Sequence, residues 1–181
     1  MDDIVAYIQH LEILAFFAGY PVVYAIVQLL ASSRPDTFKS VFPKMRKLLP
    51  LGYALTGTLF LGLILKNIFS GLSYENIMEQ FRQPLLQVWA LLSLLFWLKV
   101  FNRKPLYSLI HSLAIFFFLV KDLVIYMTSS GGNDFIRNDM KVYTDSILLN
   151  VATLIIVLII SKLSSYSRKK SVQDLQNTAS D

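Results

Sequence analysis

The sequence predicts an all-α membrane protein whose chain crosses the bilayer about five times. Apolar and aromatic residues make up 55% of its 181 residues, above the roughly 45–50% that is usual for soluble domains. These residues gather in five long runs, and a helix needs about 20 mostly apolar residues to cross a bilayer core of about 30 Å. A soluble bundle is excluded because it would have too few polar helix faces to cover its surface.

The predicted spans follow one another with short polar connections. The first contains polar residues near its start, the second is rich in small residues, and the third carries both tryptophans of the chain. The fourth includes the stretch FFFLVKDLVIY, and the fifth is mostly Leu, Ile and Val. We expect one helical bundle, residues 1–163, followed by a polar, disordered cytoplasmic tail, residues 164–181. The spans are residues 4–31, 49–69, 84–101, 106–128 and 145–163.

The distribution of Lys and Arg predicts which way the chain faces. Basic residues accumulate in loops that remain in the cytoplasm. Most of the 17 basic residues lie in the first connection, the third connection and the tail. We therefore expect the N-terminus outside and the C-terminus in the cytoplasm, as in an integral protein of a bacterial inner membrane. The basic residues on that side are Arg34, Lys39, Lys44, Arg46, Lys47, Lys99, Arg103, Lys104, Lys162, Arg168, Lys169 and Lys170.

The first connection, residues 33–48, is a basic amphipathic segment. Its apolar residues recur at helical spacing, and basic residues fill most of the remaining face. Ser33 suits a helix start, and Pro43 predicts a kink or two short helices. Such a segment lies on a membrane surface, where it either anchors the chain or docks a partner. The basic patch consists of Lys39, Lys44, Arg46 and Lys47.

Polar residues embedded in the spans share one predicted depth. A helix rises about 1.5 Å per residue, so the distance from the end of a span gives the depth of a residue. Several helices place polar side chains in the outer third of the bilayer, whereas the inner half is mostly apolar. A charge at the centre of a span costs at least about 2.5 kcal/mol, so it usually faces protein or water. The cluster consists of His10, Glu12, Lys66, Asn67, Gln87, Lys121, Asp122 and Asn150.

The two adjacent charges of the fourth span need different partners. Lys121 and Asp122 lie about 100° apart on a helix. We expect Glu12 to pair with Lys121, and Lys66 or His10 to pair with Asp122. Such pairs either link helices or line a water-filled, outward-facing pocket for a solute, ion or proton. Lys121 can also extend to the outer headgroups.

The second span carries a packing pattern of small residues. Small side chains let two helix backbones approach closely. This contact is either within the chain or between copies in a homo-oligomer. The pattern comprises Gly52, Ala54, Gly57, Thr58 and Gly62.

No enzymatic chemistry, metal or cofactor is predicted. The chain has no Cys, and His10, Glu12 and Asp122 lack the spacing of metal ligands. His10 and His111 differ in depth by roughly 14 Å at about 1.5 Å per residue, too far for one haem iron. The net charge of +5 follows the topology rule and indicates no nucleic-acid partner, which requires basic residues with base-stacking aromatics on one folded surface.

We therefore expect a non-enzymatic membrane subunit, working as a homo-oligomer or with partner proteins. The alternative is a small transporter, channel or pore-type effector that uses the outer polar cluster. Water accessibility at positions 10, 12, 121 and 122 distinguishes these two functions.

Overall fold

The computed structural model describes residues 11–32, 41–70, 84–128 and 134–178. For some residues inside α7 and α8, Asp122 among them, only the backbone is described. Residues 11–17 form a helical stretch ahead of α2. Every other element in these ranges is helical too, as predicted: α2 (Tyr20–Ser32), α3 (Phe42–Ser70), α5 (Pro84–Leu91), the 3₁₀ helix η2 (Leu92–Trp97), α6 (Lys99–Asn102), α7 (Pro105–Thr128) and α8 (Asp134–Thr178).

Three of the described helical segments are long and apolar enough to cross a membrane. They are Leu11–Ser32, Phe42–Phe69 and Lys141–Ser167, and two apolar stretches, Pro84–Trp97 and Pro105–Phe117, are shorter. The composition of the long segments is that of an integral membrane protein.

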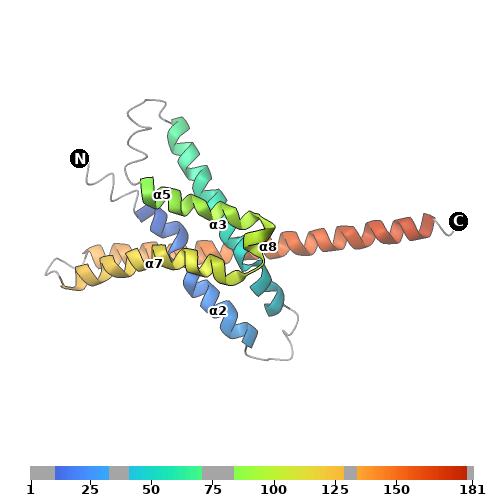
Figure 1. The fold of residues 1–181 in the computed structure, drawn as a ribbon, viewed down its shortest axis with the longest axis horizontal. Coiled ribbons are helices and arrows are strands. Elements are labelled where there is room, and N and C mark those ends of the chain that lie inside the picture. The colour runs from blue at the N-terminus through green and yellow to red at the C-terminus, as the bar shows by residue number, and fades with distance from the viewer. Residues whose placement is uncertain (1–10, 33–40, 71–83, 129–133, 179–181) are drawn as a thin grey trace.

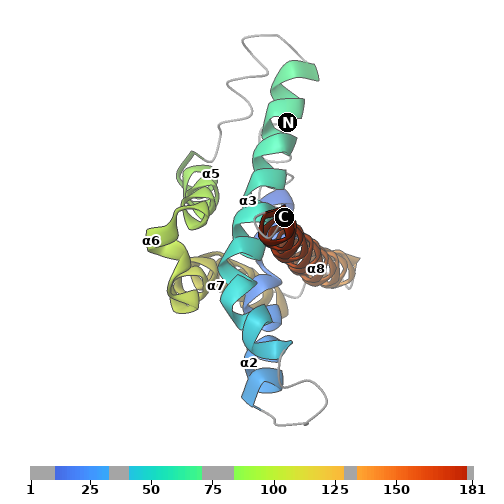
Figure 2. The same cartoon turned by 90° about the vertical axis from the view of Figure 1, so that its right-hand side faces the viewer.

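α3 is the central element of the bundle. Figure 2 shows it between α8 on one side and the segment from α5 to α6 on the other, and its most extensive contacts are with α8 and η2. At the core, the buried ring of Tyr53 meets that of Phe17 edge-on, with the ring centroids 5.7 Å apart. One face of α3 is buried at helical spacing, comprising Leu49, Tyr53, Thr56, Phe60 and Ile64.

The start of α3 corrects the predicted amphipathic segment. α3 begins at Phe42, so the end of that segment forms the first turns of a long helix. Pro43 lies in the first turn, where its missing N–H breaks no helical hydrogen bond, and it is Pro50 that lies inside the helix. Lys44, Arg46 and Lys47 are exposed on these turns, whereas Lys39 lies outside the described residues.

The predicted third span, residues 84–101, is interrupted. α5 passes into η2, and Leu98 is extended, with φ −75° and ψ 135°, before the single turn of α6. A 3₁₀ helix has three residues per turn, so side chains three residues apart point in the same direction. In an α-helix the directions of such side chains differ by about 60°. The buried positions Ser93 and Phe96 therefore point the same way in η2, beside α3, and they follow the buried Gln87 and Ala90 of α5.

α8 is much longer than the predicted fifth span. It has 45 residues, so residues 164–178 continue the helix where the sequence predicted a disordered tail. The stretch contains neither Gly nor Pro, the residues that interrupt helices most strongly. Figure 1 shows its C-terminal part extending away from the other helices. The apolar part of Lys141–Ser167 is only 28% buried, against 56% for Leu11–Ser32 and 50% for Phe42–Phe69.

Candidate functional site

The first long apolar segment is broken near its middle. A turn at residues 18–19 separates helical residues 11–17 from α2. Pro21 has no N–H, so it cannot bond to the carbonyl of Phe17 as a helical residue would. Gly19 lies against α8, where an added Cβ would be 2.7 Å from the Cα of Ile147. Only glycine permits this backbone-to-backbone contact.

α8 supplies hydrogen-bond partners at the break. The N–H of Gly19 donates to Ser146 Oγ at 2.8 Å, and Asn150 Nδ2 donates to the carbonyl oxygen of Phe16 at 2.8 Å. Ser146 and Asn150 are four residues apart and therefore share one face of α8, and both are buried. Irregular backbone within a membrane requires such partners because lipid offers none.

Asn150 directs its side chain entirely to protein partners. Its Nδ2 also donates to the carbonyl of Ser146 at 2.8 Å, and its Oδ1 lies 3.3 Å from Oγ1 of Thr56, which donates to it. Thr56 in turn lies 3.2 Å from Oγ1 of Thr153. An amide side chain has two N–H donors and one carbonyl. Both donors are engaged here, and the carbonyl shares the O–H of Thr56 with the carbonyl of Gly52, which lies 3.2 Å from Oγ1 of Thr56. We call Thr56, Ser146, Asn150 and Thr153 the polar seam; it joins residues 11–17, α3 and α8.

A second group of contacts surrounds His111 on α7. Its Nδ1 shares a hydrogen bond of 2.8 Å with the hydroxyl of Tyr53. The Trp89 ring stacks on the imidazole at 4.9 Å with an interplanar angle of 2°, and Trp89 Nε1 donates to the His111 carbonyl at 3.1 Å. Nearby, the hydroxyls of Tyr20 and Ser108 lie 2.7 Å apart. These contacts connect α2, α3, α5 and α7.

The described members of the predicted polar cluster have different surroundings. Asn150 belongs to the polar seam, because α8 begins at Asp134 and places Asn150 well inside the helix rather than near its end. No ion pair joins Glu12 to Lys121 within the part of the chain that the structure describes. His10 and the side chain of Asp122 lie outside the described residues. Lys66 and Lys121 are exposed, Gln87 and Asn150 are buried, and Glu12 and Asn67 are partly exposed.

The small residues of α3 pack in two directions within the chain. Gly57 faces η2, where an added Cβ would lie 3.1 Å from the Cβ of Ser93 and closer still to its hydroxyl. Gly52 faces α8, and an added Cβ would lie 3.4 Å from the Cα of Leu154. Ala54 is fully buried. The predicted close packing therefore occurs inside the chain at these positions.

Thr58 and Gly62 do not follow the same pattern. Thr58 is exposed and accepts a hydrogen bond of 2.9 Å from Trp97 Nε1. Gly62 is exposed, and a Cβ added there would meet nothing within 4 Å. Gly62 thus takes no part in helix packing within the described part of the chain, because the stripe rotates away from α8 and η2 along the helix.

Basic residues from separate segments line two adjoining clefts. The first cleft, of about 340 Å³, is lined by Lys47, Lys99, Asn102, Arg103 and Pro105. The second, of about 560 Å³, is lined by Val41, Lys44, Lys47, Leu48, Leu158, Ser161, Lys162, Ser165 and Tyr166. Lys47 lines both clefts, and none of the described residues around them is acidic.

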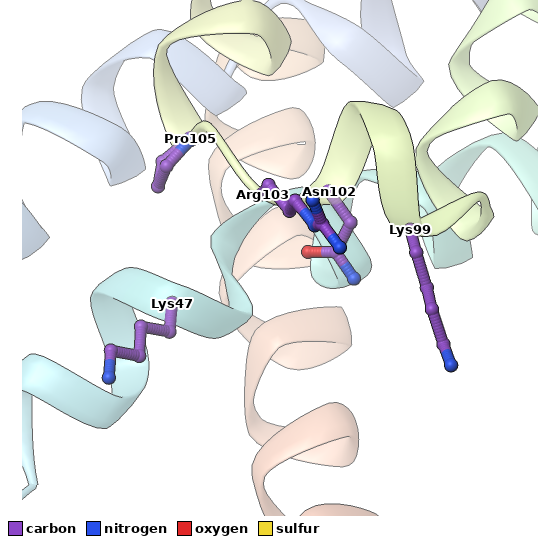
Figure 3. Close-up of a pocket in the computed structure, with 5 residues that line it drawn as sticks. All are labelled: Lys47, Lys99, Asn102, Arg103 and Pro105. Carbon is purple, nitrogen blue, oxygen red and sulfur yellow. The ribbon is translucent and has the colours of Figure 1, made fainter.

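The side chains of the first cleft come from the start of α3 and from the α6–α7 turn. Figure 3 shows Lys47 and Lys99 on opposite sides of Asn102 and Arg103. Ammonium, guanidinium and amide N–H groups are all hydrogen-bond donors, so this arrangement can bind an anion. The sequence identified Lys47 as part of a surface patch, but its position in clefts shared with Lys99, Arg103 and Lys162 depends on how the helices pack.

The break in the first helix was not predicted from the sequence. The signal was the tetrapeptide AGYP at residues 18–21, since Gly and Pro two residues apart interrupt a helical pattern. The partners, Ser146 and Asn150, could not be assigned from sequence because they lie more than 120 residues away, at separations of 127 and 134. No protein-family model, curated protein or solved structure matches this chain.

Proposed function

We propose that this protein is a non-enzymatic, multi-pass membrane protein that acts as a subunit of a membrane assembly, formed with further copies or with partner proteins. The proposal includes five passages through a bacterial inner membrane, with the N-terminus outside and the C-terminus in the cytoplasm. Support for this orientation comes from the clefts, because basic residues of α3, α6 and α8 line shared space and so lie together, as the positive-inside rule requires.

The engagement of the Asn150 side chain by protein groups is the observation that carries the proposed role. A solute or ion pathway needs polar groups with unused hydrogen-bonding capacity facing water. Here the amide of Asn150 is engaged by Phe16, Ser146 and Thr56, so the polar seam binds helices to one another. Polar contacts between membrane helices stabilise a bundle by about 0.6–2 kcal/mol each. A bundle held in this way presents its binding surfaces on the outside.

α8 offers one such surface. Within residues 141–167 its buried positions form one stripe, and several apolar side chains on the other side are uncovered, with Leu148 61%, Ile155 48% and Ile159 52% exposed. In a membrane this face contacts lipid or another helix. Assembly through it would bury apolar side chains against a matched helix surface, where packing between helices provides the stabilisation.

Single-cysteine crosslinking in native membranes tests the proposal. The chain has no Cys, so Ile159→Cys reports only its own contacts. We expect oxidation to give a discrete crosslinked dimer, or one defined adduct with a partner. Val157→Cys is the matched control, since Val157 is 7% exposed on the opposite side of α8 and should not crosslink. Absence of crosslinks from Leu148, Ile155 and Ile159 alike would exclude an assembly through this face.

One observation favours a transporter as the second candidate. Transporters bind their substrates where discontinuous helices expose backbone groups near the middle of the membrane, and the first long segment is broken at residues 18–19. If transport is the function, Asn150→Ser should keep the fold and alter flux of a solute or ion into proteoliposomes. If the seam is structural, Asn150→Ser should lose stability, and the wild-type protein should show no flux.

A further inference from the structure

The two clefts share a chemistry that the proposed function does not use. Five basic residues line them, from α3, from α6 and the turn after it, and from α8, and Lys47 lines both clefts. All five are exposed: Lys44, Lys47, Lys99, Arg103 and Lys162. Like charges brought together in this way repel one another, so a bound anion would lower the energy of the arrangement.

The second cleft is amphipathic. Val41, Leu48 and Leu158 contribute apolar wall, while Lys44, Lys47 and Lys162 contribute charge. Three hydroxyl groups, those of Ser161, Ser165 and Tyr166, line the same space. A soluble phosphate would gain nothing from the apolar wall. A phospholipid uses both parts, because its phosphate is joined to acyl chains that seek apolar contact.

The exposed face of α8 continues the apolar wall away from the basic end. Leu158 lies one helical turn before Lys162, and Ile155 lies one turn before Leu158, with 48% of its side chain exposed. A lipid whose phosphate contacts Lys162 can therefore lay an acyl chain along α8 toward the middle of the membrane. Basic pockets between helices at the cytoplasmic side bind anionic headgroups in this manner.

We infer that the two clefts form a binding site for the phosphate headgroup of an anionic phospholipid, with Lys47 at its centre. Lys44 and Lys162 bind the headgroup from the second cleft, and Lys99 and Arg103 from the first. The apolar wall of Val41, Leu48 and Leu158 receives the start of an acyl chain. The inference goes beyond the assembly role and is testable in detergent, independently of orientation or oligomeric state.

Native mass spectrometry of the full chain in neutral detergent provides the test, with phosphatidylglycerol and phosphatidylcholine as probes. The wild type should retain phosphatidylglycerol in preference. Lys47→Gln should weaken retention about fivefold, and Lys47→Gln with Lys162→Gln about 25-fold, since each basic residue near an anionic lipid contributes about 1 kcal/mol. Lys47→Arg keeps the charge and should retain the lipid. Helical content and elution volume confirm that each variant is folded.

Arg46→Gln is the matched control. Arg46 is exposed on the same turns of α3 but lines neither cleft, so its removal should change retention less than twofold. An equal loss in Arg46→Gln and Lys47→Gln would overturn the site in favour of general charge attraction. Glycerol 3-phosphate carries the phosphate without acyl chains, and we expect it not to displace the lipid at equal concentration. Displacement by it would identify a soluble phosphate ester as the ligand and overturn the lipid assignment.

Discussion

The side-chain amide of Asn150 on α8 donates a hydrogen bond of 2.8 Å to the carbonyl oxygen of Phe16. The bond spans the point at which the first long apolar segment is broken, and Ser146 receives the N–H of Gly19 one turn away on α8. A Gly–Tyr–Pro sequence can therefore lie within an apolar bundle without leaving these backbone groups unpaired. This relationship explains why a run of Leu, Ile and Val contains Ser146, Asn150 and Thr153.

Replacing Asn150 with Leu should destabilise the bundle. The carbonyl of Phe16 would lose its donor, and an unpaired buried polar group costs about 1–3 kcal/mol. Unfolding in a titration with a denaturing detergent measures the loss. Ser164→Leu, an exposed change on the same helix, should have little effect. Equal stability of Asn150→Leu and the wild type would refute the stabilising role of the Asn150 hydrogen bonds.

Three Gly→Ala substitutions should rank in a fixed order. Gly19→Ala is the most disruptive, because the new methyl group meets the backbone of Ser146 and Ile147, which cannot rotate away. Gly57→Ala meets the hydroxyl of Ser93, so it should cost less. Gly62→Ala meets nothing within 4 Å and should be neutral. Overpacking typically costs about 1–3 kcal/mol.

A second substitution checks the cause of the Gly57 effect. Ser93→Ala removes the hydroxyl that overlaps the new methyl group, so Gly57→Ala with Ser93→Ala should recover part of the loss. Thermal stability in detergent is the readout. If Gly62→Ala proves as damaging as Gly19→Ala, the backbone contact between residue 19 and α8 is not as described.

Two Tyr→Phe changes separate the contacts around His111. Tyr53→Phe removes the 2.8 Å partner of His111 Nδ1, and His111 Nε2 already has no hydrogen-bond partner among the described residues. Tyr20→Phe leaves Ser108 Oγ with its 2.7 Å bond to the Pro105 carbonyl. Tyr53→Phe should therefore cost about 1–3 kcal/mol, more than Tyr20→Phe. The reverse order of melting temperatures would contradict this arrangement.

Labelling at the two ends of one apolar segment tests the orientation. Lys141 and Ser164 are exposed near opposite ends of Lys141–Ser167. In intact cells, an impermeant maleimide should label Lys141→Cys, whereas Ser164→Cys should react only after the membrane is opened. Lys44→Cys should behave like Ser164→Cys because both lie at the basic end. Surface labelling of Ser164→Cys would reverse the proposed topology.

The helical class and most helix positions could be predicted from the sequence because long apolar runs are a local signal. α7 begins within one residue of its predicted span. The interruption after Trp97 and the length of α8 were not predicted. η2 adapts to the surface of α3, where Ser93 fills the space beside Gly57. The extension of α8 follows from the absence of Gly and Pro, a signal that the polar composition of residues 164–178 concealed.

The polar residues were harder to place because depth alone does not fix the face of a helix. Glu12 and Lys121 share a predicted depth, yet Lys121 is exposed and the two form no ion pair in the described structure. Asn150 was identified as an embedded polar residue. Its partner Phe16, beside the break in the first helix, lies 134 residues away in the sequence. The clefts likewise require the tertiary meeting of α3, α6 and α8.

Solvent accessibility of the polar seam tests most directly whether it is structural. Thr153 is 1% exposed, and Thr153→Cys places a single thiol there in a chain without native Cys. The account predicts that a small water-soluble maleimide leaves Thr153→Cys unmodified in folded protein, applied from either side of the membrane, and labels it fully after denaturation. Rapid labelling of the folded protein would place water along the seam, contradicting a structural role and supporting a transport pathway.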